Sequence, residues 1–144
     1  MHPPGPAPTV DILIEHEARL ILIRRRNPPH GWAIPGGFVD LGESAENAAR
    51  REAREETSLE VELVTLLGVY SDSTRDPRGH TISTVYVAHS RGGQPCAADD
   101  AAELGLFDET TLPEPLVFDH ARILADYFHF KRTGALPKPA PPRR

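Results

Sequence analysis

The sequence of 144 residues contains one cysteine, one tryptophan and one methionine, and only 6% of its residues are aromatic. A single cysteine, Cys96, excludes an internal disulfide, and no set of histidines and cysteines has the spacing of a zinc site. No apolar run approaches the roughly 20 residues that span a bilayer, and the N-terminus lacks the apolar region of a signal peptide. We therefore expect a cytoplasmic protein that does not associate with membranes.

Basic residues are also fewer than acidic residues. The chain has 16 Lys and Arg against 21 Asp and Glu, which gives a net charge of -5 at pH 7. This balance argues against a nucleic-acid-binding protein, and a phosphorylated ligand would need local arginines or metal ions. The length suits one domain, expected over residues 9–132, because proline-rich segments at 1–8 and 133–144 favour a disordered arm and a tail.

Residues 37–59 contain the most informative pattern, a glycine loop followed by a long segment without glycine or proline. Ser44 is a good N-cap, so a helix should begin there. Between Ser44 and Thr57 the only apolar residues are alanines, so this helix has no large apolar stripe to hold it on a core. Glu52 and Glu56 lie one turn apart. A solvated, salt-bridged face is the alternative, but we expect these carboxylates to face inward, where they need cations.

This stretch resembles the Nudix box, G-x5-E-x7-R-E-U-x-E-E-x-G-U, in which U is a bulky aliphatic residue. The matching residues are Gly37, Glu43, Arg51, Glu52, Glu55, Glu56 and Leu59, preceded by the usual lead-in at 32–37. Two positions depart from the pattern, since Ala53 replaces the first U and Ser58 replaces the second glycine. The glycine would lie just past the helix end, where a left-handed backbone costs most other residues about 1 kcal/mol.

The resemblance covers about residues 9–132 and implies the Nudix fold, an α/β (α+β) arrangement in which a mixed β-sheet is sandwiched between helices. By the same resemblance, Glu52, Glu55 and Glu56 are metal ligands, and oxygen ligands favour Mg²⁺, with Mn²⁺ as a substitute. Arg51 would orient a glutamate through an ion pair, and Glu43 would brace the junction between loop and helix.

The remaining secondary structure follows from alternating or continuous apolar residues and from turn residues. Strands are predicted at 10–15, 20–23, 32–34, 61–70, 82–88 and 103–107, and a second helix is predicted from an N-cap at Asp119 to about 132. The first two strands should form a hairpin, and 61–70 should pair with 82–88, with an irregularity at Val64 and Thr65. Pro35, Gly36 and Gly37 should turn the backbone where a side chain would obstruct it.

Three consecutive arginines end the second predicted strand. Alternation sends Arg24 and Arg26 to one face and Arg25 to the other. A solubilising strand end is the alternative reading. Because basic residues near this position contact substrate phosphates in similar Nudix enzymes, we assign Arg24 and Arg26 to substrate binding, together with Gly37 of the box.

The loop at 75–80 reads Arg-Asp-Pro-Arg-Gly-His and resembles that of the ADP-ribose pyrophosphatase branch. Arg75, Arg78 and His80 would suit an anionic diphosphate or ribose, although an ordinary polar hairpin loop is the alternative. Asp99, Asp100 and Glu103 resemble a further acidic stretch of this branch. The general base could be Glu55, Glu56 or Glu103.

The resemblance therefore implies metal-dependent hydrolysis of a nucleoside diphosphate linked to another group, with ADP-ribose giving AMP and ribose 5-phosphate as the leading case. One alternative is a nucleoside-triphosphate pyrophosphohydrolase of the housecleaning type. Another is a non-catalytic ADP-ribose sensor, which the intact glutamates and the absence of a DNA-binding domain after residue 132 disfavour. Related ADP-ribose hydrolases are often dimers, so we also expect that a homodimer can form.

Overall fold

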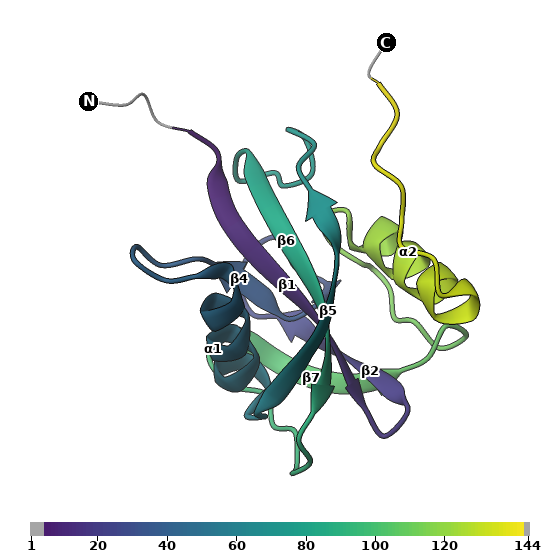
Figure 1. The fold of residues 1–144 in the computed structure, drawn as a ribbon. Coiled ribbons are helices and arrows are strands. Elements are labelled where there is room, and N and C mark those ends of the chain that lie inside the picture. Colours follow the sequence, from purple (N-terminus) through teal and green to yellow (C-terminus); the bar gives the residue numbers. More distant parts are fainter. Residues whose placement is uncertain (1–4, 143–144) are drawn as a thin grey trace.

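The first strand, β1 (Ala7–His16), is buried on both faces in the computed structural model, which describes residues 5–142. Val10, Ile12 and Ile14 pack on one face with helix α1 (Ala45–Thr57), whereas Leu13 packs on the other with helix α2 (His120–Thr133). Figure 1 shows the two helices on opposite sides of the sheet. The predicted mixed sheet between helices is confirmed, and Leu13, which interrupts the alternation, supplies the second face.

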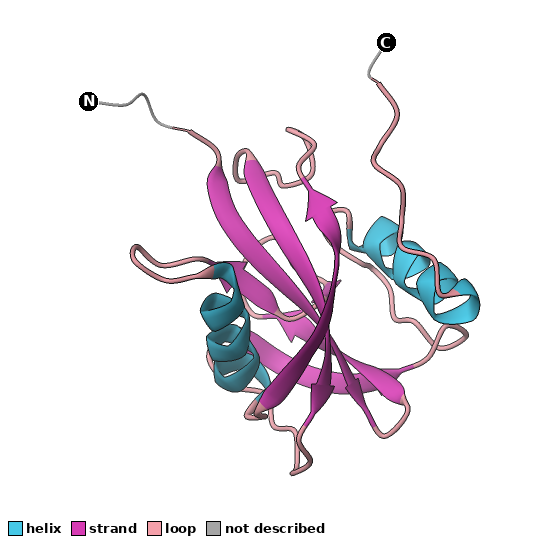
Figure 2. Cartoon of the chain, viewed as in Figure 1, coloured by secondary structure: helices cyan, strands magenta, loops and turns pink. Residues whose placement is uncertain are grey.

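The seven strands form one sheet (Figure 2). Its main order is β3-β2-β1-β6-β5, while β4 pairs with β1 and β7 pairs with β2. The other strands are β2 (Arg19–Arg25), β3 (Trp32–Ala33), β4 (Gly36–Phe38), β5 (Val61–Tyr70), β6 (Thr81–Ser90) and β7 (Ala101–Phe107). The predicted β1–β2 and β5–β6 hairpins are confirmed, and the β5 ladder shifts register between Leu63 and Thr65. The parallel pairing of β1 with β6 joins these hairpins into one sheet.

Strand β4 corrects the expectation of a simple turn at 35–37. Gly36 pairs with Asp11, and Gly37 pairs with Val10. A Cβ atom on Gly36 would lie 2.1 Å from the backbone oxygen of Val10, so only glycine allows this close approach. The glycines therefore place a short strand beside β1, against the part of α1 that carries Glu52 and Glu56.

Helix α1 approaches the sheet closely because its inward side chains are small. Ala48, Ala49 and Ala53 are fully buried, and Ala53 occupies the position at which the Nudix box has a bulky aliphatic residue. At its start, Ser44 Oγ accepts a hydrogen bond of 3.1 Å from the Asn47 N–H. At its end, Ser58 has a φ of 65° and donates its backbone N–H to Arg54 O. The predicted left-handed helix end is thus confirmed, with a serine in place of glycine.

The chain termini differ slightly from the expected boundaries. Ala7 and Pro8 already pair with β6, so the strand includes the end of the expected arm. Residues 1–4 of that arm and 143–144 of the tail lie outside the described residues, and residues 135–142 form no helix or strand. Within residues 5–142, no helix is long and apolar enough to cross a membrane.

Candidate functional site

A cavity of about 280 Å³ lies where α1, β1 and β4 meet the loops that precede β6 and α2. Two glutamates of α1, Glu52 and Glu56, line it together with three arginines, Arg25, Arg75 and Arg78. The aromatic rings of Phe38 and Phe118, along with Asp76 and Asp100, complete much of its remaining wall. The cavity therefore combines carboxylates and guanidinium groups, which could bind a cation and an anion next to each other.

The two glycines of β4 make room for the carboxylates. The side chain of Glu56 is only 3% exposed, and its Oε1 accepts a hydrogen bond of 2.9 Å from the Gly36 N–H. A Cβ atom on Gly37 would lie 2.5 Å from Oε1 of Glu52. A side chain at position 37 would therefore displace the Glu52 carboxylate, and glycine leaves it room at the cavity.

The electrostatics of these glutamates favour a bound cation. Burial raises the pKa of the Glu56 carboxyl well above its ordinary value, and the nearby charge of Glu52 raises it further. Burial also raises the pKa of Glu52, although Arg51 opposes this effect. Carboxylate oxygens are the donors that hard divalent ions prefer, so Glu52 and Glu56 fit such an ion.

Arg51 links the loop of the box to the helix. Its guanidinium donates to both carboxylate oxygens of Glu43, at 2.8 and 2.9 Å, and to Glu52 Oε1 at 2.8 Å. It also donates to the backbone oxygen of Phe38 at 3.0 Å. The hydrogen bonds from Arg51, with that from the Asp40 N–H, lower the pKa of Glu43 to about 2. Glu43 therefore remains charged and holds Arg51 where it can orient Glu52.

Glu55 is placed differently from the other two glutamates assigned as metal ligands. Its side chain is 43% exposed and pairs with Arg51 at 3.1 Å, outside the residues that line the cavity. Among residues 5–142, no group of three or more His, Cys, Asp or Glu side chains is arranged to hold a metal ion. The expected set of three glutamates is thus represented in the cavity by Glu52 and Glu56 alone.

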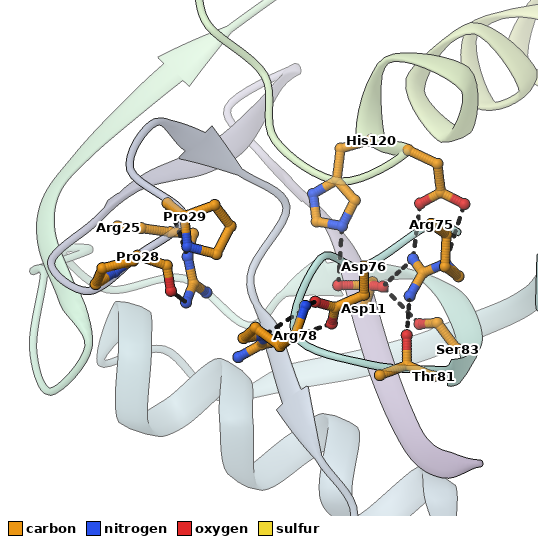
Figure 3. A network of polar contacts seen from close by, with 11 residues as sticks. Asp11, Arg25, Pro28, Pro29, Arg75, Asp76, Arg78, Thr81, Ser83 and His120 are labelled. Atoms are coloured by element: carbon orange, nitrogen blue, oxygen red, sulfur yellow. Dashed lines mark hydrogen bonds and ion pairs between the residues drawn. The ribbon is translucent and has the colours of Figure 1, made fainter. Parts of the chain in front are cut away.

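Arg24 and Arg26, which the sequence assigns to substrate binding, lie outside the residues that line the cavity. Arg24 pairs with Glu103 at 3.3 Å, both about half exposed, and Arg26 donates to the backbone oxygens of Asp99 and Ala101. Arg25 points into the cavity instead, and it donates to the oxygens of Pro29 and Pro28 at 2.9 and 3.3 Å (Figure 3). Alternation separated Arg25 from its neighbours correctly, but it could not indicate which face holds the cavity.

Glu103 lies on β7 opposite Arg24, pairs with it, and does not line the cavity. Its role as a catalytic carboxylate stays a prediction. Asp100, from the same acidic stretch, does line the cavity. Of the three carboxylates considered as the general base, Glu56 is the one in the cavity.

The loop before β6 divides its three predicted substrate-binding residues. Arg75 is only 7% exposed, and it donates to both carboxylate oxygens of Asp119 at 2.7 and 3.0 Å and to Thr81 Oγ1 at 2.7 Å (Figure 3). His80 contacts the backbone oxygen of Ser71 and lies outside the cavity. Arg75 and Arg78 both line the cavity, and Asp76 orients Arg78 by accepting hydrogen bonds from its Nε and Nη2. The guanidinium of Arg75 is thus engaged by Asp119 and Thr81, and a role for Arg75 and His80 in substrate binding stays a prediction.

Two buried residues at the cavity were not identified from the sequence. His120 Nδ1 accepts a hydrogen bond of 3.0 Å from the Ile34 N–H, and its Nε2 lies 3.4 Å from Asp11 Oδ1. Burial raises the pKa of Asp11, but His120, Ser83 and Arg75 outweigh it, so the net shift is downward. The charged Asp11 on β1 thus contacts His120 at the start of α2, and His120 in turn contacts the segment before β4 through Ile34. Ile34 and His120 are 86 positions apart, so no local sequence signal could have paired them.

Comparison with known proteins agrees with this architecture. The NUDIX domain family model matches residues 5–127. The chain is 48% identical over 128 residues to an ADP-ribose pyrophosphatase from Methanocaldococcus jannaschii, which covers 88% of this chain and 75% of that protein. The structure resembles a NUDIX hydrolase from Nitrosomonas europaea, with a TM-score of 0.80, 25% identity, and coverage of 92% and 76% of the two chains.

A second solved structure is that of a bifunctional NMN adenylyltransferase/ADP ribose pyrophosphatase from Francisella tularensis, complexed with AMP and a Mn ion. Its TM-score is 0.74 at 26% identity, and the match covers 87% of this chain and 42% of that one. The match to the family model spans most of the chain, and Gly37, Glu52 and Glu56 of the box line one cavity of the fold. The chain belongs to the Nudix family.

Proposed function

We propose that this protein hydrolyses the diphosphate bond of ADP-ribose to give AMP and ribose 5-phosphate, with Mg²⁺ as its metal ion. The observation that carries the proposal is the single cavity in which Glu52 and Glu56 lie with Arg25 and Arg78. The 48% identity to an ADP-ribose pyrophosphatase supports the choice of substrate. A diphosphate repels an incoming nucleophile through its anionic oxygens, so hydrolysis requires both kinds of charge at this place.

Glu52 and Glu56 would hold the divalent ion. When bound, this ion would offset negative charge on the diphosphate and acidify the attacking water. Gly36 fixes one oxygen of Glu56 through its N–H, and Arg51 fixes one oxygen of Glu52. Each carboxylate therefore keeps one oxygen that is not committed to these contacts. The chain thus sets the position of both ligands before any ion binds.

Arg25 would bind the diphosphate. Within the described part of the chain, no carboxylate forms an ion pair with Arg25, which is held by two carbonyl oxygens instead. Burial and the charge of Arg78 lower the pKa of Arg25 more than the charges of Glu56, Asp100 and Asp76 raise it, so these carboxylates compensate its charge only in part. A phosphate oxygen would supply that compensation through charge-assisted hydrogen bonds.

A substrate panel with Mg²⁺ tests the proposed function. ADP-ribose, sugar nucleotides, dinucleotides and nucleoside triphosphates would be compared by kcat/KM and by released products. We expect ADP-ribose to give the highest value. A nucleoside triphosphate that exceeds it tenfold, which corresponds to about 1.4 kcal/mol of transition-state preference, would contradict the assignment. Tight binding of ADP-ribose without turnover would indicate a sensor instead.

Replacing Arg25 with alanine should raise the KM for ADP-ribose at least tenfold, with a smaller change in kcat. The loss of one charge-assisted contact in a half-buried cavity corresponds to about 1.5 to 3 kcal/mol, of which ground-state binding should account for most. Arg24→Ala is the matched control, because Arg24 lies next in sequence but pairs with Glu103 outside the cavity. We expect Arg24→Ala to change both constants less than twofold. Equal effects of the two substitutions would support the assignment made from the sequence.

The stability of the metal-free protein should fall as the pH rises from 5 to 8. The pKa of Glu56 is raised by folding from 4.5, so the folded protein binds more protons than the unfolded chain above that pH. A raised pKa contributes stability that is present at low pH and is lost as the pH increases. A shift of one pKa unit corresponds to about 1.36 kcal/mol, and water and Arg51 reduce the repulsion between the glutamates. We therefore expect the free energy of unfolding to fall by about 2 kcal/mol. Glu56→Gln should flatten this dependence.

Urea unfolding with a chelator at pH 5.5 and 8 would measure this effect, and a Mg²⁺ series would measure its reversal. Because Mg²⁺ binds the folded cluster in preference to the unfolded chain, Tm should rise with its concentration, and less so in Glu56→Gln. A Tm independent of Mg²⁺, together with destabilisation by Glu56→Gln at pH 8, would support a salt-bridged structural helix.

A cytoplasmic location and a homodimer remain predictions.

A further inference from the structure

Phe118 has a backbone conformation that is unfavourable for its side chain. Its φ is 57°, in the left-handed region that costs an L-residue about 1 to 2 kcal/mol. The chain is fixed on both sides of it, because the Val117 N–H bonds to Trp32 O and Asp119 binds Arg75. Glycine would satisfy this backbone without strain. Since strained residues often lie at functional sites, the phenyl ring itself requires an explanation.

The ring of Phe118 contacts two of the three arginines of the cavity, Arg25 and Arg78. The guanidinium carbon of Arg25 lies 5.2 Å from the ring centroid, and that of Arg78 also lies 5.2 Å from it. Arg78 lies 5.1 Å from the ring of Phe38 as well. Each distance is within the range of a cation–π interaction. A single ring thus attracts two cations that would otherwise repel each other.

These two cations are not equally neutralised. Asp76 binds Arg78 through both of its carboxylate oxygens, at 2.9 and 3.1 Å. Arg25 is held by the carbonyl oxygens of Pro28 and Pro29, without an ion-pair partner in residues 5–142. Asp76 thus compensates Arg78 directly, whereas Arg25 has only carboxylates of the cavity that form no ion pair with it, Glu56 and Asp100 among them. An anion with oxygens on two adjacent centres could contact both guanidinium groups at once.

The geometry points to Phe118 as a positioning residue that holds Arg25 and Arg78 on one ring, so that both guanidinium groups bind the substrate diphosphate together. This inference rests on the proposed function only in naming a diphosphate as the anion. Phe118 also packs beside a small apolar cluster of Ile23, Ala33, Ala101 and Val117. A purely structural role would therefore be to fill space, which leucine would largely preserve.

Phe118→Leu keeps an apolar side chain but removes the aromatic face. We expect it to raise the KM for ADP-ribose about tenfold and to change kcat less than threefold. Phe118→Tyr retains the ring and should recover most of this loss. Phe118→Gly relieves the backbone strain but lacks the ring, so its KM should stay raised as in Phe118→Leu. A wild-type KM in Phe118→Gly would show that the ring has no role and would overturn the inference.

Phe128→Leu is the matched control, because Phe128 lies on α2 and packs with Tyr127 away from the cavity. It should leave KM within twofold of the wild-type value. The decisive measurement is a double-mutant cycle with Arg25→Ala. If Phe118 acts through the arginines, adding Phe118→Leu to Arg25→Ala should raise KM less than threefold further. The full tenfold factor in both backgrounds would overturn the inference and indicate direct contact with the base or ribose.

Binding of inorganic pyrophosphate to the chelator-treated protein separates this inference from the proposed function. Phe118→Leu should weaken pyrophosphate binding about tenfold, whereas Phe128→Leu should not. If ADP-ribose is a poor substrate but pyrophosphate binding still depends on Phe118 and Arg25, the proposed substrate fails and the positioning role stands. If ADP-ribose is hydrolysed but pyrophosphate binding and KM are indifferent to Phe118→Leu, the positioning role fails alone.

Discussion

Glu56→Gln should lower kcat at least a hundredfold while the protein stays folded. Glutamine keeps the size of the side chain and can still accept the hydrogen bond from the Gly36 N–H. It lacks the negative charge, however, and Glu56 is the most deeply buried carboxylate of the cavity. Loss of a ligand charge weakens the hold on a divalent ion that must offset charge in the transition state. A hundredfold loss corresponds to about 2.7 kcal/mol of transition-state stabilisation.

Two other substitutions of glutamate by glutamine control this experiment. Glu62→Gln changes an exposed carboxylate on β5 and should leave kcat within twofold. Glu55→Gln should have an effect between those of Glu62→Gln and Glu56→Gln, because Glu55 contacts Arg51 and does not line the cavity. Steady-state kinetics at saturating Mg²⁺ would be combined with thermal melts. Near-normal turnover of Glu56→Gln under these conditions would mean that the metal ion does not bind to this helix.

The parts of the site that sequence reasoning predicts well are those encoded within a few residues. Ser44 caps α1, and Ser58 ends it in the left-handed conformation, because both features depend on local backbone hydrogen bonds. The one-turn spacing of Glu52 and Glu56 likewise follows from helix geometry. Alanines on the inner face of α1 predicted that carboxylates would lie near the sheet. Local periodicity could not show that Arg51 would draw Glu55 away from the cavity.

The parts that were missed depend on contacts between distant segments. Alternation along β2 separates Arg25 from Arg24, but the cavity lies on the side of Arg25 because segments distant in sequence, α1, β4 and the loops before β6 and α2, form its other walls. The parallel pairing of β1 with β6 places Asp11 beside Ser83 and the start of α2. Neither pairing leaves a motif in the sequence. Polar residues such as Asp11, read as the outward side of a strand, can therefore be buried.

Replacing Arg75 should cost the protein more stability than replacing an exposed arginine, because Arg75 is buried and engaged by Asp119 and Thr81. Arg75→Ala would leave the carboxylate of Asp119 without its two hydrogen bonds, at 2.7 and 3.0 Å. It would also leave Asp11 without a cation at 3.7 Å. Removing one partner of a buried ion pair costs about 3 to 5 kcal/mol, because the remaining charge stays desolvated.

Urea unfolding would measure this loss, with Arg91→Ala as the control, since Arg91 is exposed in the loop after β6. Arg91→Ala should change the free energy of unfolding by less than about 0.5 kcal/mol. Arg75→Lys keeps the charge but not the two-pronged geometry that matches a carboxylate, so its loss should be intermediate. If Arg75→Ala instead kept wild-type stability and raised only the KM for ADP-ribose, Arg75 would contact substrate. The comparison of these two effects of Arg75→Ala, on the free energy of unfolding and on KM, therefore decides between two roles for the loop at 75–80. Either both Arg75 and Arg78 bind the diphosphate, or Arg78 alone does.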